Sequence, residues 1–528
     1  MKLLFTLCCL FIGILTGCVA EEQQAIIVRL LVDGTEQIYQ NAEPITVDQF
    51  LREVRVELSS LDRVNPERWT QIFDQMVITV VRVTESESCE DEILPFRRQT
   101  RLVEGLLPGE ERIGQAGTNG IERVCYRLTI ENGAPRDRIE ISRVAVQSPQ
   151  DEIIFVGPTT ELEPVSIIGT LAYISNNNAW LMRGSSTRKR PLTTTSDLDN
   201  RVFSLTADGK GLLIARRNSA DANSFNQLWL IPDTIANIPD ILPLIPRDVR
   251  HADWVIGSND KISYSTAEPQ ASPPGWRAFN DLWLMTINPS TGEQIRVEEI
   301  LPINSGGLYG WWGTEYKWSP DGTKLAWIRA DSVGLVNLEE RQLGTPLTTY
   351  AVLNPLGDWS WRTTISWSWD SRLILTTVHG LPVGNELPET SPVFNVAAIS
   401  TDGNYVTNLV ERAGVWSTPR FSPQINTDSE FPTGYIAYLQ ARKWEESISG
   451  EYDLIIADRD GSNARVLFPP TGQAGLTAQQ FAQDFTWSPD GRQIALIYLG
   501  NLWLIDIQTG AQYQLTQDGS ASKPVWTQ

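Results

Sequence analysis

The chain contains few of the side chains that most often bind metals or carry catalysis. Only two of its 528 residues are histidines, His251 and His379. They fall in different units of a repeat described below, so a His-rich zinc site is not expected. There is no Gly-x-Ser-x-Gly nucleophile motif, and there is no Gly-Lys loop of the kind that cradles phosphates. The sequence therefore predicts no metal, no cofactor and a protein that is not an enzyme.

Basic residues are also scarce relative to acidic ones. The chain has 43 Lys and Arg against 64 Asp and Glu, a formal net charge of -21. Nucleic-acid binding needs a basic surface, so nucleic acid is not an expected partner. Hydrophobic residues make up 41% of the chain, which is enough to bury real cores, and the length suggests two to four domains.

Long apolar runs occur only at the N-terminus, MKLLFTLCCLFIGILTGCVAEE, which has the layout of a secretory signal. The stretch Leu15-Thr16-Gly17-Cys18 resembles the lipobox of bacterial lipoproteins. The resemblance implies a signal peptide over 1–17, a lipid on the sulfur of Cys18, and an anchor linker over 18–25. The expected location is the extracytoplasmic face of the cell membrane, held by that lipid. The alternative is an ordinary signal peptide in which the cysteine is there by chance.

Of the five cysteines, Cys8 and Cys9 leave with the predicted signal, and Cys18 would be lipidated. That leaves Cys89 and Cys125 as a single pair in an exported chain, where disulfides persist. We expect them to form a disulfide, the alternative being two buried free thiols.

Residues 26–70 predict a small α+β module. A β run turns at Asp33-Gly34 into a second run, and Thr46 is placed as the N-cap of a helix over VDQFLREV. With Leu61-Asp62-Arg63-Val64-Asn65-Pro66, these residues resemble the ubiquitin-like module found near five-glycine domains in bacterial wall-associated proteins.

Residues 76–158 predict an elongated all-β domain with alternating stretches such as ERVCYRLTIENG. The glycines at 109, 114, 117, 133 and 157, with the closing EIIFVG, resemble the five-glycine (G-five) domain of bacterial surface proteins. SCEDEI is expected to be an insertion, and the acidic run TESESCEDE around it a solvated loop. The family is proposed to bind N-acetylglucosamine-containing wall polymers or to act as an extended spacer. The resemblance therefore implies association with cell-wall glycan.

Residues 165–528 contain short apolar runs that recur every 45–55 residues or so, which is typical of repeats. A unit such as FTWSPDGRQIALIYLGNLWLIDIQTGAQYQLT predicts four antiparallel strands with a tight turn at Ser-Pro-Asp-Gly, which is one propeller blade. The WSPDG turn, the LW strand and the LT ending resemble the propeller of TolB-like proteins.

The first and last parts of this array are each incomplete. The first blade, LAYI with AWLMR, lacks an innermost strand, and KPVWTQ at the C-terminus is an innermost strand without a blade. The expected fold class is therefore mostly β, with a seven-bladed propeller whose C-terminal strand closes the first blade. The alternative is a six-bladed ring.

The 19 tryptophans divide into two groups. Those that recur in register with the repeat are expected to pack between blades. Seven others fall in loops that should emerge on one face of the propeller, where exposed tryptophan would favour a partner or a sugar. This candidate binding face comprises Trp276, Trp311, Trp312, Trp359, Trp361, Trp416 and Trp444. The alternative is that these rings fold back and cover the ends of the blades.

Three functions are compatible with this organisation. The first is a lipid-anchored binding protein of the cell surface, holding wall glycan through the five-glycine domain and a protein or glycan on the propeller. Its expected partners are the membrane, cell-wall glycan and other envelope proteins. The second is a propeller glycan hydrolase or lyase, which needs carboxylates converging at the channel mouth. The third is a structural assembly platform without a small ligand.

Overall fold

The computed structural model of the protein describes residues 25–41, 43–103, 106–159, 161–218, 223–425, 433–477 and 485–528. The expected signal peptide and Cys18 lie outside these residues. The fold is mostly β, as predicted. None of the helices in the described ranges is long and apolar enough to cross a membrane. The chain divides into an N-terminal unit, residues 1–99 with 113–153, and a C-terminal unit, residues 100–112 with 154–528.

The N-terminal unit begins with a four-stranded sheet in the order β2-β1-β4-β3. Its strands are β1 (Ile26–Val32), β2 (Thr35–Asn41), β3 (Arg63–Asn65) and β4 (Met76–Val81). The helix α1 (Val47–Glu53) starts at Thr46, whose side chain accepts from the Gln49 backbone N–H while the Gln49 side chain returns to Thr46. This capping box confirms the predicted N-cap. Val47, Phe50 and Leu51 are buried in one core with the sheet.

The first module extends beyond the predicted limit at residue 70. Strand β4 was expected to open the second domain, but it pairs in parallel with β1, with Val28 opposite Met76 and Leu30 opposite Ile78. A parallel partner far along the chain leaves no local sequence signal, because its hydrogen bonds are all non-local. The change of sheet comes at Arg82, which bonds to the carboxylates of Asp33 and Asp62.

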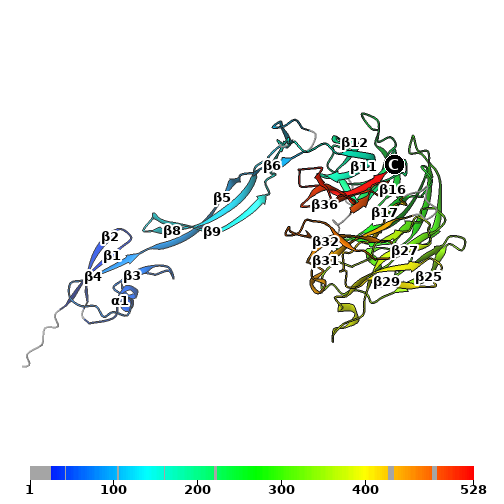
Figure 1. The fold of residues 1–528 in the computed structure, drawn as a ribbon. Helices are drawn as coiled ribbons and strands as arrows, with labels where there is room; N and C mark the ends of the chain where they lie inside the picture. The colour runs from blue at the N-terminus through cyan, green and yellow to red at the C-terminus, as the bar shows by residue number, and fades with distance from the viewer. Residues whose placement is uncertain are drawn as a thin grey trace, which may run out of the picture. The chain divides into compact units, whose positions relative to one another are not determined.

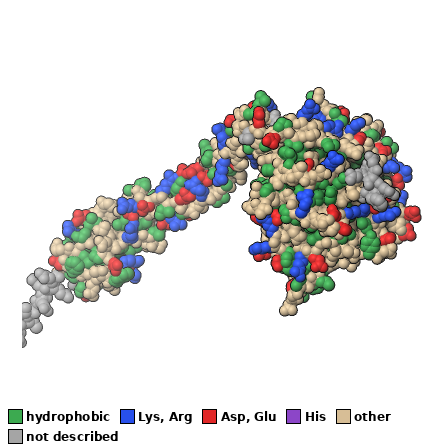
Figure 2. Space-filling model, in the orientation of Figure 1, with side chains coloured by type: hydrophobic (Ala, Val, Ile, Leu, Met, Phe, Trp, Pro, Cys, Tyr) green, Lys and Arg blue, Asp and Glu red, His purple; other side chains and the backbone are tan. Residues whose placement is uncertain are grey.

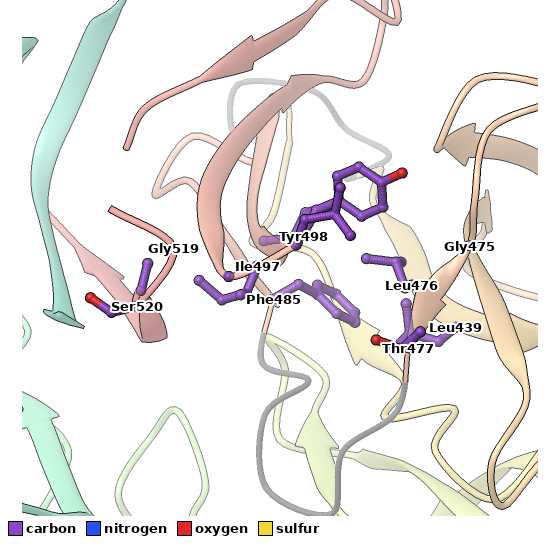
Figure 3. Close-up of a pocket in the computed structure, with 13 residues that line it drawn as sticks. Leu439, Gly475, Leu476, Thr477, Phe485, Ile497, Tyr498, Gly519 and Ser520 are labelled. Atoms are coloured by element: carbon purple, nitrogen blue, oxygen red, sulfur yellow. The ribbon is translucent and has the colours of Figure 1, made fainter. Parts of the chain in front are cut away.

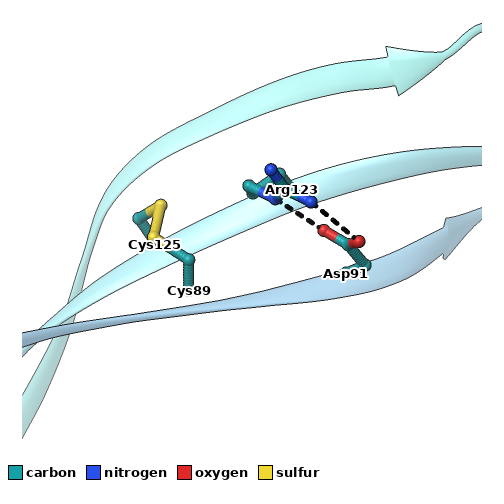
Figure 4. Close-up of a disulfide and its surroundings, with 4 residues drawn as sticks. All are labelled: Cys89, Asp91, Arg123 and Cys125. Carbon is teal, nitrogen blue, oxygen red and sulfur yellow. Dashed lines mark hydrogen bonds and ion pairs between the residues drawn. A yellow bond between two sulfur atoms is a disulfide. The ribbon is translucent and has the colours of Figure 1, made fainter.

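A long three-stranded sheet follows in the order β5-β8-β9. Its strands are β5 (Val83–Leu94), β8 (Gly120–Glu131) and β9 (Ala134–Gln147). The disulfide between Cys89 and Cys125 is confirmed, and it joins directly opposed residues of β5 and β8 (Figure 4). The expectation that SCEDEI is an insertion and TESESCEDE a loop is wrong, since both lie within the continuous strand β5.

Ion pairs across the strands explain how so acidic a segment forms a strand. Asp91 pairs with Arg123 at 2.8 Å (Figure 4), and Glu90 pairs with Arg138. Arg143 of β9 reaches both Glu92 and Glu122. Opposite charges facing one another favour strand pairing, and Figure 2 shows acidic and basic side chains side by side over this sheet. A further three-stranded sheet has the order β6-β10-β7, with β6 (Arg98–Leu102), β7 (Glu111–Gln115) and β10 (Glu152–Val156).

The C-terminal unit is a series of antiparallel sheets, mostly four-stranded meanders in sequence order (Figure 1). The first sheet has β11 (Ser166–Ser175) and β12 (Asn178–Pro191); the second has β13 (Leu198–Leu205), β14 (Leu212–Arg217), β15 (Asn226–Ile231) and β16 (Leu242–Arg247). The third has β17 (Val249–Trp254), β18 (Lys261–Pro269), β20 (Leu282–Ile287) and β21 (Gln294–Leu301), with β19 (Trp276–Ala278) beside β18. The fourth has β22 (Glu315–Trp318), β23 (Leu325–Ile328), β24 (Ser332–Asn337) and β25 (Gln342–Thr349).

The remaining sheets follow the same plan. The fifth has β26 (Ile365–Trp367), β27 (Leu373–His379), β28 (Phe394–Ser400) and β29 (Val406–Val410). The sixth has β30 (Arg420–Phe421), β31 (Tyr435–Ala441), β32 (Glu451–Asp458) and β33 (Arg465–Phe468), with β34 (Leu476–Thr477) beside β32. The seventh has β35 (Phe485–Trp487), β36 (Gln493–Tyr498), β37 (Asn501–Asp506) and β38 (Gln512–Gln514). Three short 3₁₀ helices lie between strands, η1 (Gly310–Trp312), η2 (Pro388–Thr390) and η3 (Trp444–Glu446).

The Ser-Pro-Asp-Gly turns form as their sequence predicts. In the seventh sheet the Ser488 hydroxyl donates to Asp490 at 2.6 Å, and the Gly491 N–H donates to the Ser488 carbonyl at 2.9 Å. Gly491 has a φ of 69°, a region in which only glycine is free of strain. The turn at 319–322 repeats the same bonds.

Tryptophans on the first strand of a sheet link that sheet to the one before it. The indole N–H of Trp254 donates to the Ser204 carbonyl, that of Trp318 to the Ser263 hydroxyl, and that of Trp367 to the Lys317 carbonyl. Each ring also lies in a hydrophobic cluster. The repeat-locked tryptophans therefore pack between sheets, as predicted.

The C-terminal strand β39 (Ser522–Thr527) belongs to the first sheet, whose order is β12-β11-β39. Leu171 faces Trp526 in the antiparallel ladder. The indole of Trp526 donates to the Ile168 carbonyl at 2.5 Å and is buried with Leu171 and Leu504. At Gly169 a Cβ atom would come 2.2 Å from the Thr527 carbonyl, so the close approach of β39 requires glycine there.

Candidate functional site

A cavity of about 680 Å³ lies where the first strands of several sheets meet. Its walls come from β13, β17 and β22, from the segments before β26 and β30, and from β39. This volume is in the range of small-molecule sites. Its charged lining residues are Asp199, Arg201, Arg217, Arg250, Glu315, Arg362 and Lys523.

Two interruptions of strand register bring polar side chains into the cavity. In β13 the pairing with β14 skips from Asp199 to Phe203, and in β17 the pairing with β18 skips from Val249 to His251. Bulges of this kind change the direction of side chains. As a result the neighbours Arg250 and His251 both line the cavity, although strict alternation would put them on opposite faces.

Arg362 is a largely buried cation of the cavity. Its side chain is 9% exposed, and one amino group pairs with Glu315 at 3.3 Å. Its Nε and Nη1 have no hydrogen-bond partner among the described residues. Buried guanidinium donors need an acceptor, which water or a ligand in a cavity of this size can supply.

Arg250 lies over the same cavity. Its Nη2 donates to the Trp312 carbonyl at 2.9 Å, and its Nε has no partner within the described residues. Burial, and after it the nearby positive charge of Arg362, lowers the pKa of Arg250 to about 9.

Trp276 orients two of the arginines. The guanidinium of Arg201 lies 4.5 Å from the centre of the Trp276 ring, and that of Arg250 lies 4.6 Å away. Trp312 meets the same ring edge-on at 5.6 Å. Cation–π contacts at this distance hold the charges in the cavity wall.

The two carboxylates of the cavity are each held by an arginine. Asp199 pairs with Arg201 and accepts from the Asn226 amide at 3.1 Å. Burial acts to raise the pKa of Glu315, but the charges of Arg362 and Arg250 outweigh it and the pKa is lowered. Glu315 is therefore ionised at neutral pH. Burial also lowers the pKa of His251, which is uncharged at neutral pH.

Polar atoms without partners gather at this cavity. Eight buried side-chain atoms that line it make no hydrogen bond within the described residues. They are Arg250 Nε, His251 Nε2, Trp276 Nε1, Ser360 Oγ, Arg362 Nε and Nη1, Thr377 Oγ1 and Thr418 Oγ1. Native interiors satisfy nearly all such groups, by protein, water or ligand. Across the described ranges, no three His, Cys, Asp or Glu side chains cluster as metal ligands would.

The seven tryptophans of the predicted binding face do not form one exposed surface. Trp311 is 46% exposed, but Trp312 and Trp361 are buried at 8% and 2%. Trp361 packs on Phe394 at 5.0 Å and donates to the Val415 carbonyl. The expectation of exposure is therefore wrong for these two, which have folded back as the alternative foresaw.

The other four tryptophans of that set are partly buried. Trp359 and Trp416 stack on each other at 5.6 Å, and Arg412 lies over Trp444. Four of the seven, Trp276, Trp312, Trp361 and Trp416, line the cavity. Sequence reasoning missed the charged residues beside them. Their signal is a charged side chain in a first strand that otherwise reads as buried, as in VRHADW and GTEYKW.

A second cavity, of about 340 Å³, lies between the sixth and seventh sheets (Figure 3). Leu439, Leu476, Phe485 and Leu496 contribute apolar side chains to its wall, beside the polar Thr477 and Ser520. None of the unpartnered atoms within the described residues belongs to a residue that lines it.

Comparison with known proteins identifies two family regions. Residues 85–159 match the G5 domain family, which confirms the predicted likeness to the five-glycine domain. Residues 430–525 match the dipeptidyl peptidase IV (DPP IV) N-terminal region. No curated protein matches the chain.

Among solved structures, the chain is similar to the periplasmic gluconolactonase PpgL of Pseudomonas aeruginosa, with 12% identity, 68% of this chain and 99% of that chain covered, and a TM-score of 0.41. It is similar to a structure assigned as TolB from Agrobacterium tumefaciens, with 12% identity, 58% and 90% coverage, and a TM-score of 0.32. The IgA1 protease G5 domain matches 15% of this chain over 94% of its own length, with 19% identity and a TM-score of 0.12.

Proposed function

We propose that the protein is a lipid-anchored, non-enzymatic binding protein of the bacterial cell surface, and that its C-terminal unit takes a ligand in the central cavity. The observation that carries this is the set of eight unpartnered polar atoms around about 680 Å³ of space. None of the unpartnered polar atoms within the described residues belongs to a residue of the second cavity.

The state of the two cavity carboxylates favours binding over glycan hydrolysis. Glycoside hydrolysis needs one carboxyl group that stays protonated, with a raised pKa, beside a second that is ionised. Asp199 and Glu315 are instead each paired with an arginine, and the pKa of Glu315 is lowered. Such residues position cations rather than supply a general acid.

The N-terminal unit fits the part of a spacer that also associates with wall glycan. The match to the G5 domain supports this, as does a sheet whose strands run to 12 and 14 residues. The first module, in which β1 pairs with β4 in parallel and one helix packs on the sheet, is compatible with a ubiquitin-like fold. The signal peptide over 1–17 and a lipid on Cys18, outside the described residues, would hold the protein at the extracytoplasmic face of the membrane.

The seven sheets of the C-terminal unit are proposed to be the blades of a closed propeller. The pairing of β39 with β11 supports closure, because it gives the first sheet its innermost strand from the other end of the chain. A ring seals sheet edges that an open array would expose. It would also enclose the central cavity on all sides.

The test is binding of isolated cell-wall material and a glycan array by the full mature protein. Replacing the cavity residue in Trp276→Leu should weaken binding by the C-terminal unit about 30-fold or more, as expected for a hot-spot aromatic. The matched control is Trp311→Leu, which removes an exposed tryptophan outside the cavity. If Trp311→Leu weakens binding and Trp276→Leu does not, the outer face rather than the cavity is the site. If the wild-type protein binds neither material, the proposed function is wrong.

A further inference from the structure

The charge inside the central cavity is opposite to the charge of the chain. Five cationic side chains line it, Arg201, Arg217, Arg250, Arg362 and Lys523, against only two carboxylates. The whole chain carries a net charge of -21. A concentration of positive charge in a cleft of an acidic protein focuses potential on an anionic ligand.

The two carboxylates do not use up this charge. Asp199 is paired with Arg201, and Glu315 with Arg362. Arg217, Arg250 and Lys523 make no ion pair within the described residues. The cavity therefore holds a surplus of positive charge that no side chain around it neutralises.

The free donors of the two arginines suit an oxyanion. Arg362 presents Nε and Nη1, whose N–H bonds point in different directions, so each can donate to a separate acceptor oxygen. Arg250 presents its Nε, while its Nη2 is fixed on the Trp312 carbonyl. The hydroxyls of Ser360, Thr377 and Thr418 add unpartnered groups that can donate to further oxygens.

The guanidinium positions are fixed before any ligand arrives. Arg201 and Arg250 lie over the ring of Trp276, and Glu315 holds one amino group of Arg362. Burial, and after it the like charge of Arg362, lowers the pKa of Arg250. An anion between them would relieve that repulsion, so preorganisation favours binding.

We propose that the central cavity is an oxyanion site, in which unpaired N–H donors of Arg362 and Arg250 bind the carboxylate or phosphate group of a small polar ligand. This rests on the proposed function and specifies the ligand class of the same cavity. Trp276 acts as a positioning residue, because the guanidiniums lie over its ring. Lys523 brings a further cation from the C-terminal strand.

The experiment measures binding by calorimetry to the full mature protein with four probes. Inorganic phosphate and N-acetylglucosamine-6-phosphate test a phosphate, N-acetylmuramic acid tests a carboxylate, and N-acetylglucosamine is the uncharged control. We expect the charged sugars to bind at least about tenfold more tightly than N-acetylglucosamine, with the stronger of them revealing which oxyanion is preferred.

The variants Arg362→Gln and Arg250→Gln should each weaken binding of the charged probes about tenfold to hundredfold and leave N-acetylglucosamine unchanged. The matched control is Arg296→Gln, since Arg296 is exposed on β21 and pairs with Glu298. Lys523→Gln, on the cavity wall, provides a second measurement if Arg362→Gln does not fold, and should weaken the charged probes severalfold.

Equal affinity for charged and uncharged sugars, or charged-probe affinities unchanged in Arg362→Gln, Arg250→Gln and Lys523→Gln, overturns the oxyanion site. If none of the charged probes binds the wild-type protein while cell-wall material still does, the oxyanion site is wrong and the proposed function stands. If cell-wall material, the glycan array and all four probes fail to bind, both are wrong.

Discussion

Different interactions stabilise the two units of this chain. In the N-terminal unit the β5-β8-β9 sheet has few buried side chains, and β9 is exposed along its whole length. Backbone ladders, one disulfide and cross-strand ion pairs supply its order. In the C-terminal unit nearly every sheet buries both faces in hydrophobic clusters shared with its neighbours. The β5-β8-β9 sheet thus depends on bonds within one sheet, and the C-terminal unit on contacts between neighbouring sheets.

Deletion of residues 522–528 should have the largest effect on stability, and it should affect only the C-terminal unit. The first sheet then loses the strand that carries the buried Trp526 and its bond to Ile168. Loss of a buried tryptophan alone costs about 3–5 kcal/mol, and loss of the strand should exceed that. Calorimetry should show the C-terminal transition lowered or absent.

The N-terminal transition serves as the internal control for this deletion. Its temperature should not change, because no residue of β39 lies in that unit. A C-terminal transition that melts as in the full chain would show that the ring is not closed by β39.

The converse change is Cys89→Ser with Cys125→Ser. The disulfide joins residues separated by 36 positions, and on the chain-entropy model its loss destabilises the N-terminal unit by up to about 4 kcal/mol. Reduction of the wild-type protein should reproduce the effect in thermal melts. The C-terminal transition should be unaltered, and a shift in it would mean that the two units do not unfold independently.

Raising the pH from 8 to 10 should deprotonate an arginine of the C-terminal unit and leave the paired arginines of the N-terminal unit charged. The pKa of Arg250 is lowered to about 9, whereas hydrogen bonds to carboxylates raise the pKa of Arg82 and Arg123 in the N-terminal unit. If the charged form of Arg250 binds the anion, affinity for phosphate should fall about tenfold by pH 10.

The effect of the same pH change on stability has the opposite sign. Above pH about 9 the folded unit has lost the Arg250 proton, but the unfolded chain still binds it, because the ordinary pKa of an arginine side chain is 12.5. The free energy of unfolding contributed by this group therefore rises with pH between these values. In the variant Arg250→Gln both effects should be absent.

The smallest expected effect concerns the ion pairs of the β5-β8-β9 sheet. Asp91 and Arg123 are both about half exposed, and such pairs are strongly screened. Asp91→Asn should shift the N-terminal transition far less than loss of the disulfide, and the shift should vanish in about 1 M salt, where screening is strongest. A shift as large as that of the cysteine variants would show that charge, rather than the covalent link, holds this sheet.

The sequence was informative where one signal repeats or stays local. The WSPDG turns, the tryptophans locked to the repeat and the Thr46 cap follow from short-range or repeated patterns, and the Cys89–Cys125 pair follows from the cysteine count. It was misleading at β5, because a run of acidic residues predicts a solvated loop when the arginines that pair with it are far away in the sequence. Those arginines lie on β8 and β9. It was also misleading at β4, whose partner β1 lies far back along the chain.

The central cavity could not be predicted for a related reason. Arg250 and His251 reach it only because a register shift breaks the alternation of β17. Arg362 reaches it from a segment outside the regular strands. The loop tryptophans identified this region of the sequence, but the prediction that they are exposed was wrong for Trp312 and Trp361.

The bond from Trp526 to Ile168 spans 358 positions of the chain. It also sets the order in which the cavity can be completed during synthesis. The first sheet stays incomplete until residues 522–527 have been synthesised, and Lys523 enters the cavity wall only then. A chain that ends before β39 would carry six intact sheets and an incomplete cavity wall. An intact cavity therefore requires the whole C-terminal unit.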